Sequence, residues 1–307
     1  MHTDKVAAIV VTYNRKELLL QNIAALLNQT RIDVLDILII DNHSSDGTRE
    51  ILQDYINNGT IAYRDTGSNL GGAGGFHFGI KYAVEQGYRW LWIMDDDTIP
   101  TSTALEEFLR EDENLNGQYG FLSGKVLWKD DTICTMNIQK ETKWKRMKDF
   151  ETKKKIQYAS FVSLFLRSET VRKVGLPYRE FFIWADDWEY TRRISRQDSC
   201  YYIPQSIVHH MCGSNVGADI VSAPYDRIDR FNYMYRNDVV LYRQDGFDGV
   251  LYLTIRNVIH RIRVIMKSDH KKEKLSIIRK GTREGRKFYP SVEFPGRKDG
   301  IKESVQT

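Results

Sequence analysis

Residues 90–98 read Trp-Leu-Trp-Ile-Met-Asp-Asp-Asp-Thr, an apolar run that ends in three consecutive aspartates. A continuous apolar run of this kind is typical of a strand buried on both faces of a parallel sheet. Two similar runs precede it, at residues 6–11 and 37–40, and residues 15–28 and 48–55 between them have helical patterns. This alternation predicts an α/β fold with a mostly parallel central sheet, flanked by helices and joined by right-handed crossovers.

Polar side chains follow each of these three predicted strands. Thr12, Tyr13 and Asn14 come directly after the first strand, Asp41 ends the second, and residues 95–97 end the third. In parallel sheets, ligands bind outside the carboxyl ends of the strands, where these side chains would gather. The position of the three clusters therefore predicts a ligand site at that edge of the sheet.

The triplet Asp95-Asp96-Asp97 predicts a divalent-cation site. Asp95 and Asp97 point to the same side in extended geometry. Carboxylates this close repel one another and raise each other's pKa unless a cation neutralises them. Hard oxygen ligands beside a diphosphate are the usual seat of Mg²⁺ or Mn²⁺. A solvated acidic turn is the alternative, but the buried strand before the triplet favours the metal hypothesis.

A second carboxylate pair lies in Trp184-Ala-Asp186-Asp187-Trp188. Apolar surroundings raise the pKa of a carboxylate and suit it to proton abstraction, and aromatic faces stack on sugar rings. The same acids would also stabilise the first turn of a helix, which is the alternative explanation. Both explanations can hold together.

Two further patterns each admit a functional and a structural explanation. His209-His210 follows a predicted strand at residues 201–208, and imidazole is a frequent metal ligand, although a histidine is more often structural. Residues 69–75 read Asn-Leu-Gly-Gly-Ala-Gly-Gly, which predicts either a backbone loop that closely approaches a phosphate or ribose, or a flexible turn. This segment has neither Rossmann nor P-loop spacing.

The chain has 307 residues, of which 41% are hydrophobic and 28% charged, so collagen, coiled coils and disordered tail proteins are excluded. We predict a catalytic domain at residues 1–224 and a helical extension at residues 225–307. The charged segment 139–156 has few apolar residues and is predicted to be a loop that buries little.

The C-terminal region is basic. Residues 256–307 carry 15 Lys or Arg against 6 Asp or Glu, whereas the rest of the chain is slightly acidic. An amphipathic pattern at residues 250–266 makes an anionic membrane surface the expected partner, with a solvated basic helix as the alternative. A nucleic-acid partner is not expected, because no recognition motif accompanies the charge.

The cysteines and the apolar runs indicate the compartment. Cys134, Cys200 and Cys212 lie far apart with no Cys-x-x-Cys, which excludes a zinc ribbon, argues against a disulfide scaffold and fits a reducing cytosol. No apolar run approaches the length of a membrane span, and the N-terminus has no secretory signal pattern. We therefore expect a cytoplasmic protein, peripheral at the inner face of the cell membrane.

Taken together and in this order, the motifs resemble the inverting nucleotide-sugar glycosyltransferases of family two, which have the glycosyltransferase-A fold, over residues 5–215. The stretch Val-Val-Thr-Tyr-Asn-Arg at residues 10–15 is similar to that family's first strand and nucleotide-contact turn. The resemblance implies Mn²⁺ or Mg²⁺ as cofactor and a carboxylate base for the acceptor hydroxyl. The implied roles are Asp187, with Asp186 beside it, for catalysis; Thr12, Tyr13, Asn14, Asp41, Asn69, Gly71, Gly72 and Asp96 for the nucleotide sugar; Trp184 and Trp188 for the acceptor; and Asp95, Asp97 and His210, or the adjacent His209, for the metal.

Two segments indicate which members of this family the chain resembles most. The glycine-rich segment at residues 69–75 looks most like bacterial galactofuranosyltransferases, and residues 233–237 resemble a segment of rhamnosyl- and galactofuranosyltransferases. The resemblance implies transfer from UDP-galactofuranose to a glycan or lipid-linked glycan in cell-surface polysaccharide synthesis. A rhamnosyltransferase that uses dTDP-rhamnose is the alternative donor hypothesis. A nucleotidyltransferase and a catalytically silent glycan-binding subunit are the alternatives from other classes.

Overall fold

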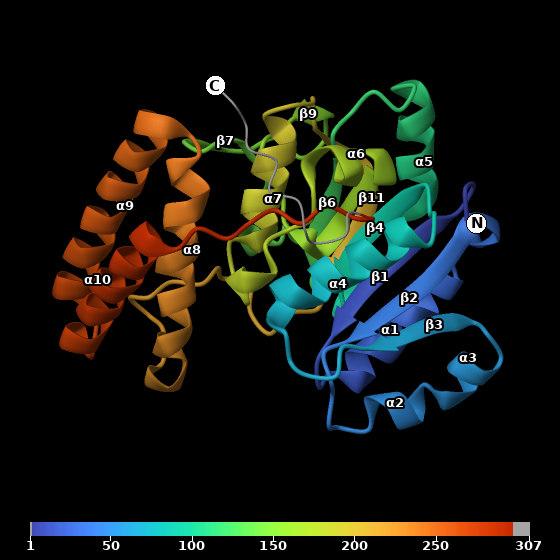
Figure 1. The fold of residues 1–307 in the computed structure, drawn as a ribbon, viewed down its shortest axis with the longest axis horizontal. Helices are drawn as coiled ribbons and strands as arrows, with labels where there is room; N and C mark the ends of the chain where they lie inside the picture. Colours follow the sequence, from blue (N-terminus) through green and yellow to red (C-terminus); the bar gives the residue numbers. More distant parts are fainter. Residues whose placement is uncertain (1, 297–307) are drawn as a thin grey trace.

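The computed structural model describes residues 2–296, and its centre is a nine-stranded sheet with helices on both faces (Figure 1). The strands are β1 (Val6–Thr12), β2 (Leu35–Asp41), β3 (Ile61–Asp65), β4 (Trp90–Asp95), β5 (Thr98–Pro100), β6 (Leu122–Trp128), β9 (Lys154–Lys155), β10 (Leu164–Arg167) and β11 (Tyr201–His210), with a separate hairpin of β7 (Lys140–Thr142) and β8 (Lys145–Arg146). Their order in the sheet is β3-β2-β1-β4-β10-β6-β11-β5, and β9 pairs with β11.

The predicted parallel arrangement is confirmed for the first hundred residues. Strand β1 is parallel to both β2 and β4, and β2 is parallel to β3. The second half is mixed, because β10 inserts antiparallel between β4 and β6 and β5 runs antiparallel to β11. In the parallel half, Thr12 lies opposite Asp41 and Val11 opposite Asp95. The register therefore brings the predicted polar clusters to one edge of the sheet.

Helices cover both faces of the sheet. They are α1 (Lys16–Leu27), α2 (Thr48–Ile51), α3 (Gln53–Asn57), α4 (Gly71–Glu85), α5 (Ala104–Asn114), α6 (Ser168–Val174), α7 (Asp186–Ser195), α8 (Phe231–Arg243), α9 (Gly246–Lys267) and α10 (Lys271–Lys287). Strand β1 is buried throughout: Ile9 and Val11 belong to the core cluster on the α4 side, and Ala8 and Val10 to the cluster on the α1 and α5 side. Burial on both faces explains its continuous apolar sequence.

The glycine-rich segment is not the loop that its composition suggested. Helix α4 begins at Gly71 and includes the remaining glycines of the segment. A Cβ at Gly75 would lie 2.6 Å from Val11 Cγ1, and a Cβ at Gly79 would lie 2.6 Å from Ile9 Cγ2. The glycines thus allow α4 to pack closely on β1, which offsets their low helix propensity.

Beyond residue 225 the predicted helices are present as α8, α9 and α10, which lie side by side at one end of the molecule (Figure 1). Their shared core includes Phe231, Tyr235, Val264 and Ile278. Residues 297–307 of the predicted extension lie outside the described residues. Within residues 2–296, no helix combines the length and the apolar composition that crossing a bilayer requires.

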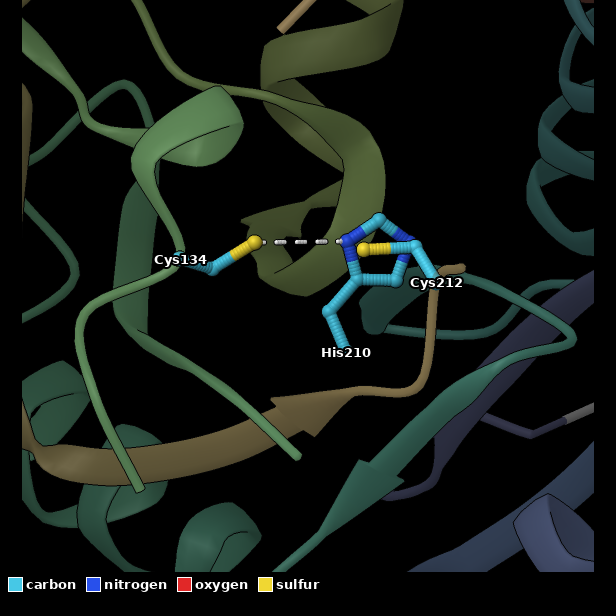
Figure 2. A group of neighbouring side chains, drawn as sticks. All are labelled: Cys134, His210 and Cys212. Carbon is cyan, nitrogen blue, oxygen red and sulfur yellow. Dashed lines mark hydrogen bonds between the residues drawn. The ribbon is translucent and has the colours of Figure 1, made fainter. Parts of the chain in front are cut away.

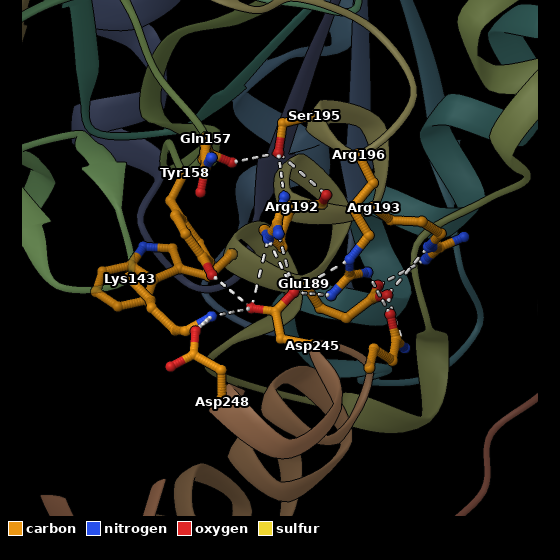
Figure 3. Close-up of polar contacts among 12 residues, drawn as sticks. Lys143, Gln157, Tyr158, Glu189, Arg192, Arg193, Ser195, Arg196, Asp245 and Asp248 are labelled. Carbon is orange, nitrogen blue, oxygen red and sulfur yellow. Dashed lines mark hydrogen bonds and ion pairs between the residues drawn. The ribbon is translucent and has the colours of Figure 1, made fainter. Parts of the chain in front are cut away.

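A buried ion-pair network fixes the turn between α8 and α9 to the rest of the protein (Figure 3). The side chain of Asp245 accepts hydrogen bonds from Arg192 Nε at 3.1 Å and Arg196 Nη2 at 2.9 Å, and from Lys143 Nζ and Tyr158 Oη at 3.3 Å each. Burial alone would raise the pKa of Asp245, but Arg196 and Arg192 hold it below its usual value. Because loss of one partner would leave a buried charge unpaired, this network ties the turn to α7 and to the β7–β8 hairpin.

The charged segment at residues 139–156 buries more than its composition predicted. Gln139 donates from Nε2 to the carbonyl of Gly124 at 2.8 Å, and the amide of Lys140 donates to the carbonyl of Tyr158 at 3.0 Å. Gln139, Lys140 and Met147 are all buried. A few inward-facing residues therefore anchor the segment, while most of its charges face solvent.

Gly79→Ala tests the close packing of α4. The added methyl group would meet Ile9 and Ile40, and we expect the free energy of unfolding to fall by about 1–3 kcal/mol, although alanine is the better helix former. Gly72→Ala is the control, because nothing lies within 4 Å of a Cβ there, and its stability should be unchanged or slightly higher. Urea denaturation followed by tryptophan fluorescence measures both variants. A Gly79→Ala protein as stable as the parent would contradict the packing argument.

Candidate active site

The carboxylates that end β4 are held by groups from three other elements. Asp97 Oδ2 accepts a hydrogen bond from Arg15 Nη1 at 2.6 Å, and Asp97 Oδ1 lies 3.1 Å from His210 Nε2. Asp96 Oδ2 accepts a hydrogen bond from Thr12 Oγ1 at 2.8 Å. The predicted residues at the ends of β1, β4 and β11 thus meet in one cluster.

Asp95, Asp97 and His210 each present one ligand atom, and these atoms all lie within 4.8 Å of one another. Two carboxylates and one imidazole form a donor set that suits Mn²⁺, and carboxylates with water suit Mg²⁺. These three residues therefore fit a divalent cation. His209 points elsewhere along β11, and its Nε2 lies 2.8 Å from Asp131 Oδ1.

The electrostatics of the cluster favour added positive charge. Burial, reinforced by Asp97, raises the pKa of Asp95 to about 6. Burial also raises the pKa of Asp96 to about 7, despite the nearby Arg15. Burial alone would raise the pKa of Asp97, but His210 and Arg15 hold it below its usual value. A divalent cation would stabilise the ionised form of all three carboxylates.

Asn137 orients the imidazole of His210. The Asn137 amide donates to Ser160 Oγ at 3.0 Å, which turns its Oδ1 toward His210 Nδ1 at 2.8 Å. An amide oxygen can only accept, so Nδ1 carries a proton. Burial alone would lower the pKa of His210, but its hydrogen bond to Asp97 raises it to about 11, so Nε2 is protonated as well and forms an ion pair with Asp97 Oδ1. A cation at this site would take the place of the Nε2 proton. A fixed ring orientation of this kind is typical of metal-binding histidines.

Asp186 and Asp187 begin α7 directly after a strained turn. Phe182, Trp184 and Ala185 have φ angles of 63°, 67° and 65°, in the left-handed region that residues with side chains rarely adopt. Such strain costs about 1–3 kcal/mol per residue and persists only where the surroundings hold it, often at functional sites. The turn fixes the direction in which the two carboxylates leave the backbone.

Asn237 of α8 supplies the hydrogen bonds that hold this turn. Its fully buried Nδ2 donates to the carbonyls of Phe181, Ile183 and Trp184 at 3.0, 3.1 and 2.9 Å. The neighbouring Arg236 donates to the carbonyl of Glu180 at 2.7 Å. The Arg236-Asn237 pair of the downstream segment therefore positions the acidic turn rather than contacting the carboxylates.

Asp187 lies in poorly hydrated surroundings. Burial, and then the charge of Asp186, raise the pKa of Asp187 well above its usual value, and burial raises that of Asp186 to about 7. Asp187 Oδ1 accepts a hydrogen bond from the amide of Trp188 at 2.7 Å. Lys140 is the nearby cation: its ammonium lies 3.5 Å from the ring centre of Trp188, and Asp187 favours its charged form.

The residues predicted to bind the nucleotide line the same edge. Asp41 Oδ1 accepts from the Ser44 amide at 2.8 Å, and its Oδ2 accepts from Tyr63 Oη at 2.6 Å. The Asn14 side chain accepts from the Ser45 amide at 2.7 Å. These contacts order the loops that follow β1 and β2. Tyr13 is 43% exposed beside them.

The start of α4 lies against the acidic turn. Asn69 Oδ1 accepts from the Gly71 amide at 2.9 Å. Gly71 has a φ angle of 71°, and a Cβ there would lie 2.1 Å from the carbonyl oxygen of Phe182, so only glycine fits. Gly72 next to it has open space. The glycine segment thus borders the carboxylate site, but as the first turn of a helix.

The two tryptophans predicted at the acceptor site are partly engaged in packing. Trp184 lies 4.8 Å, centre to centre, from the ring of Phe231 in α8. Trp188 packs edge-on against Tyr158 at 6.0 Å. Both tryptophans are half-buried, so each retains some exposed surface.

Three residues of the site were not singled out from the sequence. Arg15 follows the first polar cluster directly, so its position was a usable signal. Asn137 and Lys140 belong to the region before and within the charged segment, where no pattern distinguishes an inward-facing residue from a solvated one. Only the folded chain brings them to His210 and Trp188.

Known proteins resemble this chain over most of its length. It is 28% identical over 267 residues to the galactofuranosyltransferase GlfT1 of Mycolicibacterium smegmatis, which covers 81% of this chain and 87% of that protein. It is 29% identical over 266 residues to GlfT1 of Mycobacterium tuberculosis, with 81% and 86% coverage. The poly-beta-1,6-N-acetyl-D-glucosamine synthase of Staphylococcus epidermidis is 25% identical over 55% of this chain and 36% of that protein.

Solved structures show the same fold at low identity. GalNAc-T7, solved with UDP, GalNAc and Mn²⁺, superposes with a TM-score of 0.62 at 13% identity and covers 92% of this chain and 56% of that one. S. aureus TarS, residues 1–349, superposes with a TM-score of 0.55 at 13% identity and covers 92% and 72%. The fold is therefore that of glycosyltransferase-A enzymes. Residues 7–175 match the family model for glycosyl transferase family 2, and the chain belongs to that family.

Proposed function

We propose that this glycosyltransferase is a metal-dependent, inverting hexosyltransferase that moves galactofuranose from UDP-galactofuranose to a glycan or lipid-linked glycan in bacterial cell-surface polysaccharide synthesis. The observation that carries the proposal is that the cluster of Asp95, Asp97 and His210 lies near the acidic pair at the start of α7, so that the charge of Asp95 adds to burial in raising the pKa of both acids of the pair. The similarity to galactofuranosyltransferases over 81% of the chain supports the donor. Membership of a glycosyltransferase family favours sugar transfer over the nucleotidyltransferase alternative.

The chain's own residues account for donor binding. We infer that Asp41 and the loops after β1 and β2 receive the nucleoside, and that Asn69 and Gly72 at the start of α4 lie beside the diphosphate. Asp95, Asp97 and His210 would hold Mn²⁺ or Mg²⁺. Such a cation neutralises the charge that develops on a leaving nucleoside diphosphate. Thr12 and Arg15 fix Asp96 and Asp97 in place for this task.

Asp187 is the proposed base. It would accept the proton of an acceptor hydroxyl as the hydroxyl oxygen attacks the anomeric carbon from the face opposite the leaving group. One displacement inverts the configuration and requires no covalent intermediate with the enzyme. The raised pKa of Asp187 increases its basicity, and Lys140 is a nearby cation whose charged form Asp187 favours. Trp184 and Trp188 would flank the acceptor, and Asp186 would orient it.

The acceptor proposal extends to the cell membrane through α9. One face of this helix exposes a run of apolar side chains, each between 41% and 85% exposed: Phe247, Val250, Leu251, Ile255, Val258, Ile259, Ile262, Ile265 and Met266. The adjacent α10 exposes the basic side chains Lys271, Lys272, Arg279, Lys280, Arg283, Arg286 and Lys287. An apolar stripe beside a basic one fits the inner face of an anionic bilayer.

The arginines of α9 itself contribute less to this surface than the sequence pattern suggested. Arg256 turns inward and pairs with Asp238. Arg263 pairs with Asp219 at 2.6 Å. The basic face of the proposed helical extension after residue 224 therefore lies mainly on α10.

A donor screen tests the proposed function directly. With Mn²⁺ and a glycan acceptor, we expect UDP-galactofuranose to be consumed in preference to dTDP-rhamnose, with release of free UDP. Asp97→Ala and excess chelator should each abolish turnover, because the cation site is lost, whereas Asp131→Ala beside His209 should leave it unchanged. The amount of nucleoside diphosphate released is measured for both donors, for both variants and with chelator. A preference for dTDP-rhamnose would show that the enzyme is a rhamnosyltransferase. Full activity in the presence of chelator would refute metal dependence.

Asp187→Asn tests the base. The substitution keeps the shape of the side chain and removes its basicity, so transfer should fall by roughly 10²–10⁴-fold, the usual contribution of a positioned general base. The affinity for UDP, measured by calorimetry, should be retained because the proposed nucleotide contacts lie on other elements. Asp186→Asn, one residue away, is the matched control with a smaller expected loss. Near-parental transfer by Asp187→Asn would place the base elsewhere.

Ile259→Glu combined with Ile262→Glu tests the membrane surface. Both side chains are about half exposed, so the fold should be unaffected while the apolar face of α9 gains two negative charges. We expect binding to vesicles rich in anionic lipid to fall about tenfold or more, since each buried aliphatic side chain is worth about 1.5–3 kcal/mol. Ile51→Glu, at a similarly exposed position on α2, is the control. Unchanged sedimentation with vesicles would leave the apolar face without a membrane role.

A further inference from the structure

A cluster of two thiols and one imidazole shares His210 with the proposed cation site. Cys134, His210 and Cys212 each present one ligand atom, and these atoms all lie within 4.8 Å of one another (Figure 2). Cys134 is fully buried, His210 is 7% exposed and Cys212 is half-buried. No step of the proposed sugar transfer uses either thiol, so this cluster calls for a separate explanation.

The two ring nitrogens of His210 face different kinds of donor. Nε2 faces the carboxylate of Asp97 at 3.1 Å. Nδ1 lies 3.8 Å from Cys134 Sγ (Figure 2). The amide oxygen of Asn137 lies 2.8 Å from Nδ1 and accepts a hydrogen bond from Cys134 Sγ at 3.0 Å. Oxygen donors suit Mn²⁺ and Mg²⁺, whereas thiolate with imidazole suits Zn²⁺ and other thiophilic metals. The imidazole of His210 thus lies between hard oxygen donors on one side and soft sulfur donors on the other.

We propose that Cys134, Cys212 and His210 Nδ1 form a second metal site, for a thiophilic divalent cation such as Zn²⁺. Zn²⁺ accepts sets of Cys and His ligands, and a three-ligand set leaves its fourth position to water. Binding would release the two thiol protons and the Nδ1 proton to solvent, while the proton on Nε2 stays in place. Asp97 would accept a hydrogen bond from that N–H, which is the carboxylate–histidine–zinc arrangement that supports many zinc sites.

The shared imidazole makes the two sites exclusive. Both sites use the same ring, and two divalent cations on the two nitrogens of one imidazole would repel each other, one of them held by Asp95 and Asp97. Occupation of the thiol site therefore withdraws His210 from the proposed catalytic cation and inhibits transfer. This inhibition rests on the proposed function, whereas metal binding by the thiols does not.

Co²⁺ provides a spectroscopic test of the thiol site on the reduced, metal-stripped full chain. We expect Co²⁺ to produce thiolate-to-cobalt charge-transfer absorption in the near ultraviolet, and Zn²⁺ to remove it. Cys134→Ser and Cys212→Ser should each lose this absorption. Cys200→Ser is the matched control, because Cys200 is also a buried free thiol but contacts the carbonyl of Asp198. Absence of the absorption in the parent, or its survival in both variants, would overturn the site.

Cys212 is half-buried, so we expect Cys212→Ser to fold normally, and circular dichroism can verify the fold of the variant. In the transfer assay with Mn²⁺, Cys212→Ser should retain activity, and its half-inhibitory Zn²⁺ concentration should rise by roughly 10–100-fold, a range typical for weakened metal sites. Equal Zn²⁺ sensitivity in parent and variant would refute exclusivity. Cobalt absorption without transfer from any donor would refute the proposed function alone, and transfer without cobalt absorption would refute the thiol site alone.

Discussion

Five carboxylates converge where the central sheet ends, and the surrounding structure is arranged to tolerate their charge. They are Asp95, Asp96 and Asp97 at the end of β4 and Asp186 and Asp187 at the start of α7. Burial is the main cause that raises the pKa of four of them, and mutual repulsion adds to it. Each group therefore needs a compensating cation or donor, and these come from four elements: Arg15 before α1, Lys140 of β7, the end of β11 and the first turn of α7.

The C-terminal helices are part of this arrangement rather than an appendage to it. Asn237 of α8 satisfies three carbonyls of the strained turn, and the turn determines how Asp187 enters the site. Asp245, in the turn between α8 and α9, binds Arg192 near the end of α7 and Arg196 just after it. Helix α7 is thus held at both ends by the region that also carries the apolar face of α9. A membrane bound to the apolar face of α9 would therefore be linked to the proposed base through α7 and the residues that hold it.

The sequence predicted those parts of the site that are defined by their position after a strand. The apolar runs end at Thr12, Asp41 and Asp95, and parallel pairing makes their ends coincide without any long-range information. The antiparallel insertion of β10 could not be predicted in this way, because it depends on which distant strand fits between β4 and β6. The glycine segment predicted a loop or a flexible turn because glycine permits unusual backbone conformations, but tight contact between α4 and β1 favours a helix there.

Lys140 shows most clearly where local pattern stops being informative. It is one of many cations in the charged segment, yet it is buried, because Gln139 and Met147 beside it are anchored and its ammonium stacks on Trp188. Desolvation lowers the pKa of Lys140 to about 7, and Asp187 opposes this shift by favouring its charged form. Electrostatic attraction is mutual, so Lys140 favours the ionised form of Asp187 in return. The proposed base must be ionised among aromatic side chains, and a cation that favours this form comes from a segment whose composition is that of a solvated loop.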